Sequence, residues 1–157
     1  MALKERYKSI VAVFLILTRL NDDRTEVLLQ KRQNTGYMDD KYDTACSGHL
    51  DPKESVMTAL VREAKEEIGI TIREEDLDLA IVVHSVDEEY IKFFFNTNSY
   101  LGTPQIQEPE KCSDLRWFPI DNLPNDMVPH IKSTLENIEK GVKCDDGNFT
   151  LSKRRKN

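Results

Sequence analysis

The sequence from Gly48 to Ile70 reads GHLDPKESVMTALVREAKEEIGI. Beyond the proline that follows Asp51, this stretch contains no glycine or proline before Ile68, and its residue types favour an α-helix. Asp51 is one candidate for the N-cap of this helix, and Ser55 is a second. Gly69 predicts a left-handed C-terminal end. The sequence therefore predicts one helix between Asp51 and Gly69.

The predicted helix has one apolar stripe and, beside it, one acidic sector. At 100° per residue, Glu63, Glu66 and Glu67 fall within a sector of about 100°. Like charges at these spacings oppose helix stability, and a carboxylate next to an apolar stripe is costly to bury. The acidic sector therefore indicates that a cation binds there. The apolar residues of the stripe are Val56, Met57, Leu60, Ala64 and Ile68.

The chemistry of this sector favours a hard divalent cation. Carboxylate oxygens held at this spacing suit Mg²⁺ or Mn²⁺. Arg62 precedes Glu66 by four residues, so it is placed to hold a carboxylate or to contact an anionic substrate. By composition alone, an amphipathic surface helix with a solvated Glu-rich face would explain the stretch equally well. The spacing of the whole stretch decides between the two interpretations.

The complete stretch resembles the Nudix box. That motif is a glycine, five residues, Glu, seven residues, Arg-Glu, an apolar residue, any residue, Glu-Glu, any residue, Gly and an apolar residue. Every fixed position matches, which chance would produce about once in 10⁸ start positions. The chain is therefore similar to the Nudix hydrolases. The matching residues are Gly48, Glu54, Arg62, Glu63, Ala64, Glu66, Glu67, Gly69 and Ile70.

Composition and length restrict the class of protein. The 157 residues suit one domain, and the net charge of −6 argues against an extended nucleic-acid surface. Cys46, Cys112 and Cys144 lack metal-site spacing and indicate reduced thiols. The apolar run Ile10–Leu17 is too short to span a membrane and predicts a buried strand. We therefore expect a cytoplasmic protein that binds neither a membrane nor a nucleic-acid polymer.

The remaining sequence predicts an α+β fold. The resemblance implies the Nudix α/β/α sandwich, with a mixed sheet and a central loop-helix-loop catalytic motif. We expect a single domain over residues 1–141, followed by a flexible tail over residues 142–157. The expected strands are Ser9–Leu20, Glu26–Arg32, Tyr42–Cys46, Leu79–Asp87, Tyr90–Asn98 and Leu115–Phe118, and the second expected helix is Pro129–Lys140.

The resemblance also implies roles for the residues of the motif. Glu63, Glu66 and Glu67 correspond to the metal ligands, and one of them is a candidate general base. Arg62 corresponds to the residue that holds this cluster in place. The backbone carbonyl of Gly48 is a further expected metal ligand. These five positions form the expected catalytic centre.

Four further residues are candidates around that centre. Glu54 is expected to orient groups on the substrate side, at the other end of the helix. His49 can contact phosphate, although a loop histidine is more often simply hydrogen-bonded. Tyr37 can stack on a base. Glu108 resembles a MutT-like glutamate that lies six residues after a glycine and supplies a metal ligand; a solvated loop acid is the alternative.

The resemblance implies hydrolysis of a nucleoside diphosphate linked to another group, X. We expect a Mg²⁺-dependent enzyme that converts a nucleoside triphosphate to a monophosphate and pyrophosphate, as MutT-like members do. The proline typical of ADP-ribose-cleaving members is missing from residues 85–87, and the NADH-type SQPWP signature is also absent. The alternatives are a nucleotide-sugar or dinucleotide pyrophosphatase, and a nucleotide-sensing module without catalysis. A monomer or a homodimer is expected.

Overall fold

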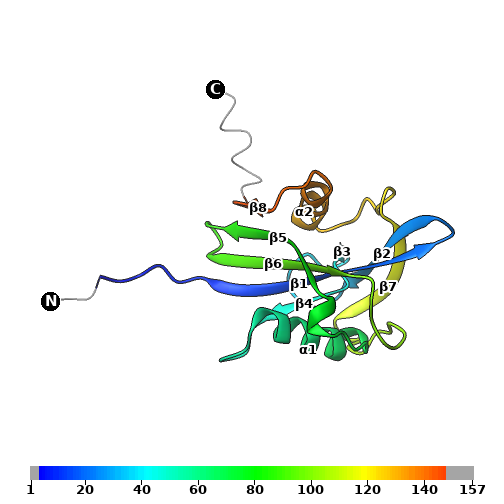
Figure 1. Ribbon diagram of the computed structural model, residues 1–157, viewed down its shortest axis with the longest axis horizontal. Helices are drawn as coiled ribbons and strands as arrows, with labels where there is room; N and C mark the ends of the chain where they lie inside the picture. Colours follow the sequence, from blue (N-terminus) through cyan, green and yellow to red (C-terminus); the bar gives the residue numbers. More distant parts are fainter. Residues whose placement is uncertain (1–3, 148–157) are drawn as a thin grey trace, which may run out of the picture.

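The structure, a computed structural model, describes residues 4–147. Its central sheet lies between helices α1 and α2, which cover opposite faces (Figure 1). This arrangement confirms the expected α/β/α sandwich. The elements in chain order are β1 (Ile10–Asn21), β2 (Arg24–Arg32), β3 (Tyr42–Asp43), β4 (Cys46–His49), α1 (Val56–Ile68), the 3₁₀ helix η1 (Glu74–Asp76), β5 (Asp78–Ser85), β6 (Tyr90–Thr97), β7 (Cys112–Pro119), α2 (Pro129–Glu139) and β8 (Cys144–Asp145).

The sheet is mixed, as the sequence predicts. Its main order is β3-β2-β1-β6-β5-β8, with β4 paired to β1 and β7 paired to β2. The pairs β1–β6 and β5–β8 are parallel, and the other pairs are antiparallel. Strand β1 therefore pairs with β2, β4 and β6, and it connects the two halves of the sheet.

The apolar run in β1 is continuous because each face of this strand is buried under a different helix. Successive side chains of a strand point to opposite faces. Val13 and Leu15 pack with Leu60 of α1, whereas Phe14 packs with Ile131 of α2. Both helices are held by apolar burial, which contributes about 25 cal/mol for each Å² removed from water.

Three expectations about local structure need correction. The helix starts after Ser55, the second candidate N-cap, rather than at Asp51: the Ser55 hydroxyl accepts a hydrogen bond from the Thr58 N–H over 3.1 Å. The expected strand Tyr42–Cys46 is two strands, β3 and β4, and Gly48 lies inside β4. Within the expected tail, Cys144–Asp145 forms β8 beside β5. Residues 148–157 lie outside the described residues.

The helices in the described range, residues 4–147, are also too short or too polar to cross a membrane. The longest helix, α1, has thirteen residues and carries the charged motif. A transmembrane helix needs about 20 consecutive apolar residues.

Candidate active site

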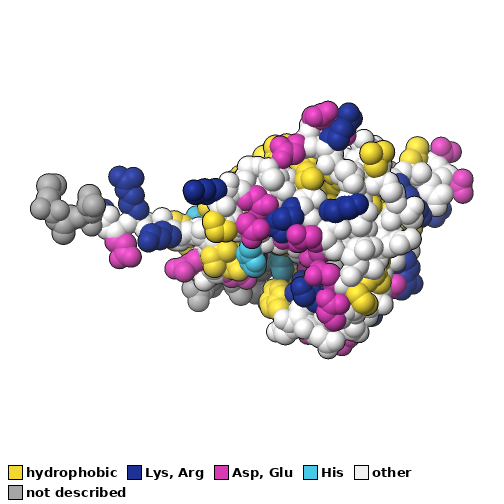
Figure 2. All heavy atoms as spheres, turned by 90° about the horizontal axis from the view of Figure 1, so that it is seen from below, with side chains coloured by type: hydrophobic (Ala, Val, Ile, Leu, Met, Phe, Trp, Pro, Cys, Tyr) yellow, Lys and Arg dark blue, Asp and Glu magenta, His cyan; other side chains and the backbone are white. Residues whose placement is uncertain are grey.

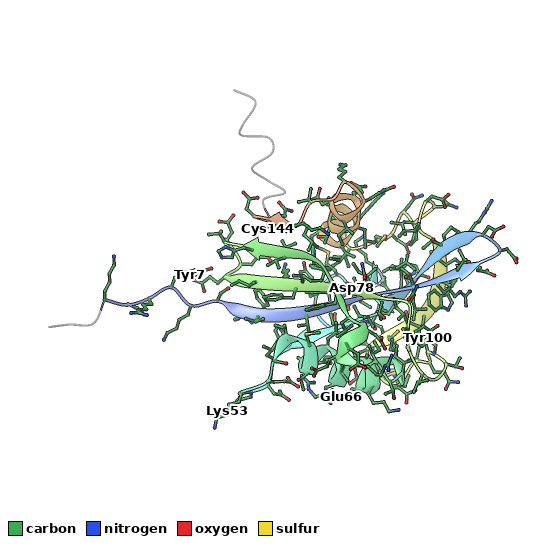
Figure 3. The ribbon with its side chains drawn as sticks, in the orientation of Figure 1. Tyr7, Lys53, Glu66, Asp78, Tyr100 and Cys144 are labelled. Carbon is green, nitrogen blue, oxygen red and sulfur yellow. The ribbon has the colours of Figure 1, made fainter. Side chains whose placement is uncertain are left out.

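Helix α1 positions the acidic residues of the motif. Its C-terminal end is fixed by Gly69, which has a φ of +72° and donates its backbone N–H to the carbonyl of Lys65 over 3.2 Å. Glu66 lies on the outer side of α1, where about half of its side chain is exposed (Figure 3). Glu63 and Glu67 are much less exposed. The helix therefore presents its three carboxylates to different environments.

Arg62 connects both ends of the motif. Its guanidinium donates two hydrogen bonds to Glu54, over 2.8 and 3.0 Å, and a third to Glu63 Oε1 over 2.8 Å. It also contacts Glu66 Oε2 at 3.2 Å and the backbone carbonyl of His49 at 3.0 Å. These bonds lower the pKa of the Glu54 carboxyl and raise the pKa of Arg62. Arg62 thus fixes two carboxylates and the strand end that precedes α1.

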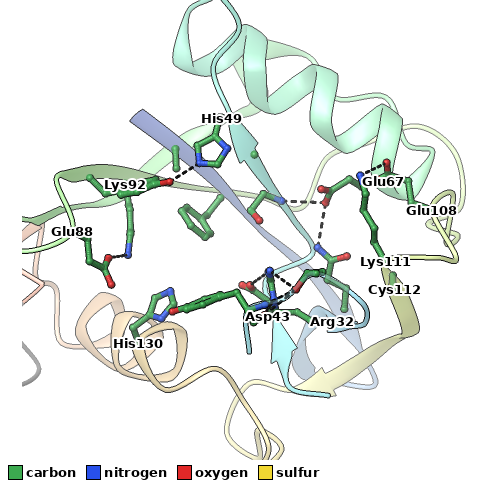
Figure 4. A pocket seen from close by; sticks show the side chains of 18 residues that line it. Arg32, Asp43, His49, Glu67, Glu88, Lys92, Glu108, Lys111, Cys112 and His130 are labelled. Atoms are coloured by element: carbon green, nitrogen blue, oxygen red, sulfur yellow. Dashed lines mark hydrogen bonds and ion pairs between the residues drawn. The ribbon is translucent and has the colours of Figure 1, made fainter. Parts of the chain in front are cut away.

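Glu67 points toward the sheet and lies in the least solvated environment of the three. Its Oε2 accepts a hydrogen bond from Gln30 Nε2 and one from the Ser47 backbone N–H, each over 3.2 Å (Figure 4). Burial, and next the charge of Glu63, raise the pKa of Glu67 to about 8, although the two hydrogen bonds oppose the rise. A cation placed among these carboxylates would stabilise the charged form of Glu67 and so lower its pKa.

Glu63 and Gly48 occupy adjoining space. A Cβ atom at Gly48 would overlap with Oε1, Cδ and Cγ of Glu63. The strand therefore requires a glycine at this position so that the Glu63 carboxylate can approach the backbone. Burial raises the pKa of Glu63 despite its bond to Arg62. The result is a carboxylate held against the Gly48 backbone, next to the Ser47 N–H that binds Glu67.

The loop before β7 is attached to the end of α1. The Gln105 N–H donates to the carbonyl of Ile68, and the Gln107 N–H donates to the carbonyl of Glu67, each over 3.0 Å. These bonds satisfy helix-end carbonyls that have no partner within the helix. They also bring Glu108 close enough for its charge to raise the pKa of Glu67. Glu108 therefore lies near the acidic residues of α1 although it comes from a separate element.

Glu67 and Glu108 line a cavity of about 540 Å³ on the α2 side of the sheet. On the face drawn in Figure 2, acidic and basic side chains surround a hollow that contains histidine side chains. Of the expected site residues, Gly48, His49, Glu67, Tyr37 and Glu108 line the cavity, whereas the other four belong to the Arg62 network beside it. The complete lining is Ala12, Phe14, Gln30, Arg32, Thr35, Tyr37, Asp43, Ser47, Gly48, His49, Glu67, Glu88, Tyr90, Lys92, Glu108, Lys111, Cys112 and His130.

The sequence interpretation missed the opposite side of this cavity. Lys92 is buried in β6 and forms an ion pair with Glu88 over 2.7 Å, and Arg32 forms one with the buried Asp43 over 3.0 Å. His130 of α2 completes this side. Glu88, in the turn between β5 and β6, has a side chain that is about half exposed and also lines the cavity. The sequence gives one indication of this side: a lysine, Lys92, lies within the apolar run YIKFFFNT. A lysine buried in such a strand requires a partner.

The acidic residues fit a divalent metal by donor type and by mutual repulsion. In residues 4–147, no three His, Cys, Asp or Glu side chains converge on a single point. Arg62 neutralises Glu63 and Glu66, and Glu67 accepts hydrogen bonds from neutral groups. However, the charges of Glu63 and Glu108 both raise the pKa of Glu67, so the three carboxyl groups are close enough to interact. A hard cation would relieve this repulsion.

Comparisons with known proteins identify the family of this chain. The family profile described as the NUDIX domain matches residues 8–138. The chain is 32% identical over 78 residues to the NAD-capped RNA hydrolase NudC of Stutzerimonas stutzeri (strain A1501), a match covering 50% of this chain and 27% of NudC. It therefore spans about a quarter of NudC's length.

Two further proteins match over most of their length. The uncharacterized Nudix hydrolase YvcI of Bacillus subtilis (strain 168) is 28% identical over 139 residues, which cover 85% of this chain and 83% of YvcI. The crystal structure of a MutT NUDIX hydrolase from Burkholderia pseudomallei is 26% identical, with a TM-score of 0.70, covering 82% of this chain and 97% of that chain. These matches extend well beyond the acidic motif to almost the whole domain.

Proposed function

This chain belongs to the NUDIX family, and we propose that it is a Mg²⁺-dependent pyrophosphohydrolase that acts on a nucleotide. The observation that carries the proposal is the acidic group at one side of the cavity, formed by Glu63 and Glu67 of α1 and by Glu108 of a separate loop. Arg62 keeps this group in place through its bonds to Glu54 and Glu63.

Each residue would have a distinct part in the reaction. Glu63, Glu66, Glu67, Glu108 and the Gly48 carbonyl would hold Mg²⁺ or Mn²⁺, which neutralises phosphate charge and activates water when it is bound. Glu67 lines the cavity and is oriented by hydrogen bonds from Gln30 and the Ser47 N–H, so its carboxylate is the candidate to accept a proton from the attacking water. This assignment is part of the proposal.

We favour a nucleoside triphosphate as substrate, with a nucleoside monophosphate and pyrophosphate as products. The structural match to a MutT NUDIX hydrolase supports this choice. The second candidate, a dinucleotide pyrophosphatase activity, draws support from the match to a NAD-capped RNA hydrolase over half of this chain. A cytoplasmic location is also proposed, and the three free cysteines agree with a reducing compartment.

A panel of nucleotides tests the proposal. The protein is incubated with each nucleoside triphosphate, with NADH, with ADP-ribose and with a nucleotide sugar, with Mg²⁺ or with excess EDTA, and the products are separated by chromatography. We expect Mg²⁺-dependent release of pyrophosphate from a triphosphate in one step. Orthophosphate and a diphosphate as the first products would contradict the assigned position of cleavage.

The control is Glu67→Gln protein purified in parallel, which excludes contaminating phosphatases. Turnover of NADH alone would favour the dinucleotide candidate over the triphosphate. A folded protein that turns over nothing in the panel would favour the nucleotide-sensing module. Full turnover in EDTA would contradict the metal-dependent mechanism.

A further inference from the structure

The side of the cavity opposite Glu67 contains a buried cation with spare hydrogen-bonding capacity. The Lys92 side chain is only 10% exposed, and its ammonium donates one hydrogen bond to Glu88 Oε2 over 2.7 Å. Among the described residues this is the one hydrogen bond that the structure gives to the ammonium, which has three N–H groups. Burying a lysine is costly, so the remaining N–H groups face the cavity at an energetic penalty that a ligand acceptor would remove.

Between the two sides, the cavity is lined by the apolar side chains of Ala12 and Phe14. In the sheet, Ala12 of β1 pairs with His49 on one side and with Lys92 on the other. One register step away, Phe14 stacks on Phe94 with ring centroids 4.5 Å apart and an interplanar angle of 12°. The methyl group of Ala12 and the ring of Phe14 both line the cavity and give it an apolar surface. A planar aromatic group can pack against such a surface.

His130 and Tyr37 complete the side around Lys92. Burial lowers the pKa of His130, and the charge of Lys92 lowers it further, which favours the neutral imidazole with its one donor and one acceptor. The Tyr37 ring lies with its centroid 6.4 Å from that of His130. Tyr37 is about half exposed, so its ring is accessible to a ligand.

The charge balance on this side decides what kind of group it suits. The Lys92 ammonium is paired with Glu88, and the guanidinium of Arg32 is paired with Asp43. Both cationic side chains on this side are therefore already paired with a carboxylate, which leaves neither of them free to bind a phosphate group. The same residues offer several donors and acceptors. This side therefore suits a neutral, planar group with hydrogen-bonding edges.

We propose that the polar end of the cavity, defined here as Glu88, Lys92 and His130, binds the nucleobase of the substrate nucleotide. Figure 4 shows these three residues across the cavity from Glu67 and Glu108. The Lys92 ammonium donates to an acceptor on the base, and the Glu88 carboxylate accepts from an N–H group. The phosphates then extend toward the acidic side. The assignment of the phosphates rests on the proposed function, whereas base binding is tested separately.

Calorimetric titration with nucleosides in excess EDTA tests base binding without metal or catalysis. Adenosine, guanosine, cytidine and uridine are the ligands, and ribose is the control ligand. We expect at least one nucleoside to bind with a dissociation constant in the millimolar range or below, and ribose to bind more weakly. Absence of binding by all four up to about 10 mM, or equal binding of ribose, would overturn the proposal.

Variants at the polar end identify where the nucleoside binds. Lys92→Met keeps the length of the side chain and removes its donors, and we expect it to weaken binding about tenfold. Lys140→Met, at an exposed lysine after α2, is the matched control and should bind as the wild type does. Unchanged affinity in a folded Lys92→Met protein would overturn the proposal. If Lys92→Met does not fold, His130→Ala replaces it as the test. We expect His130→Ala to weaken nucleoside binding several-fold, and unchanged affinity would overturn the proposal.

Hydrolysis provides an independent measurement. In Lys92→Met, the ratio of kcat/KM between the preferred and the poorest nucleoside triphosphate should fall about tenfold, mainly through KM. An unchanged ratio would overturn base recognition while leaving the proposed hydrolase intact. Conversely, nucleoside binding that depends on Lys92 in a protein without hydrolytic activity would support the base site and contradict the proposed function.

Discussion

The carboxylate of Glu63 occupies the space in which a side chain at Gly48 would begin. The φ angle of Gly48 is not positive, so the backbone conformation itself would accept an alanine. The glycine is required by the close approach of the carboxylate and not by a turn. The motif glycine therefore acts through the position of Glu63.

Gly48→Ala should thus lower activity by displacing Glu63. We expect kcat to fall about tenfold or more, because a shift of about 1 Å in a catalytic group has effects of this size. A double-mutant cycle with Glu63→Ala checks the cause. If displacement of Glu63 is the mechanism, Gly48→Ala adds little to the loss in Glu63→Ala. Full additivity of the two losses would contradict it.

Glu67→Gln should remove most of kcat while the protein stays folded. The amide keeps the size of the side chain but is a poor metal ligand and cannot accept the proton from water. We expect a fall of about 100-fold or more in initial rate with saturating Mg²⁺. Lys65→Gln, at an exposed neighbour on α1, serves as the control. Similar rates for Glu67→Gln and the wild type would show that the metal site is elsewhere.

The raised pKa of Glu67 predicts how stability depends on pH in metal-free protein. Burial raises this pKa from 4.5 to about 8, so between these values the folded state holds a proton that the unfolded state has lost. Raising the pH across this range therefore favours unfolding. Relative to Glu67→Gln, the wild type should lose a few kcal/mol of unfolding free energy between about pH 5 and pH 8. Urea denaturation in EDTA measures the unfolding free energy of both proteins at each pH. If the two proteins showed the same dependence on pH, the prediction would be contradicted.

Glu108 and Glu110 form a matched pair on one loop. Glu108 lines the cavity and interacts with Lys111 over 3.1 Å, whereas the side chain of Glu110 is exposed and is not part of the cavity lining. Glu108→Ala should lower kcat and raise the Mg²⁺ concentration needed for half-maximal rate, with little change in Tm. Glu110→Ala should change kcat and the Mg²⁺ concentration for half-maximal rate much less. Equal effects of the two substitutions would exclude Glu108 from the metal site.

Arg62→Lys should cost stability as well as activity. Lysine cannot make the two-pronged bond to Glu54 and also hold Glu63, so we expect a loss of about 1–3 kcal/mol in unfolding free energy. Arg73→Lys removes a similar bond to Asp76, but Arg73 is mostly exposed and the loss should be below about 1 kcal/mol. Urea denaturation of both variants checks the difference. Equal losses would mean that the Arg62 network contributes no more than a surface pair.

The sequence predicted the architecture because its strongest signals are local. The apolar stripe that contains Leu60 and Ala64 is buried as expected, and the long run in β1 is covered on both faces. The choice between Asp51 and Ser55 as N-cap could not be made from residue types, because both side chains can cap a helix. It depends on where the chain leaves β4, which is a tertiary property.

The polar end of the cavity was not predicted for a different reason. Lys92 and His130 are far apart in the sequence and come together through the packing of α2 on the sheet. Their spacing carries no repeated pattern, and a single charged residue in an apolar strand has many explanations. The motif therefore predicts the acidic side of the cavity, because Glu63 and Glu67 lie on one helix, whereas the opposite side has no such local pattern.

The backbone N–H groups of Gln105 and Gln107 donate hydrogen bonds to the last carbonyls of α1. The acidic motif therefore cannot be transplanted into another protein without this loop. A designer who transplants only residues 48–70 would leave those carbonyls without their partners and would lose Glu108. The portable unit consists of the motif together with residues 102–111, although more than 30 residues separate the two segments in the chain. With Glu108 as a metal ligand, as proposed, variation in that loop would change metal use while every residue of the motif stays the same.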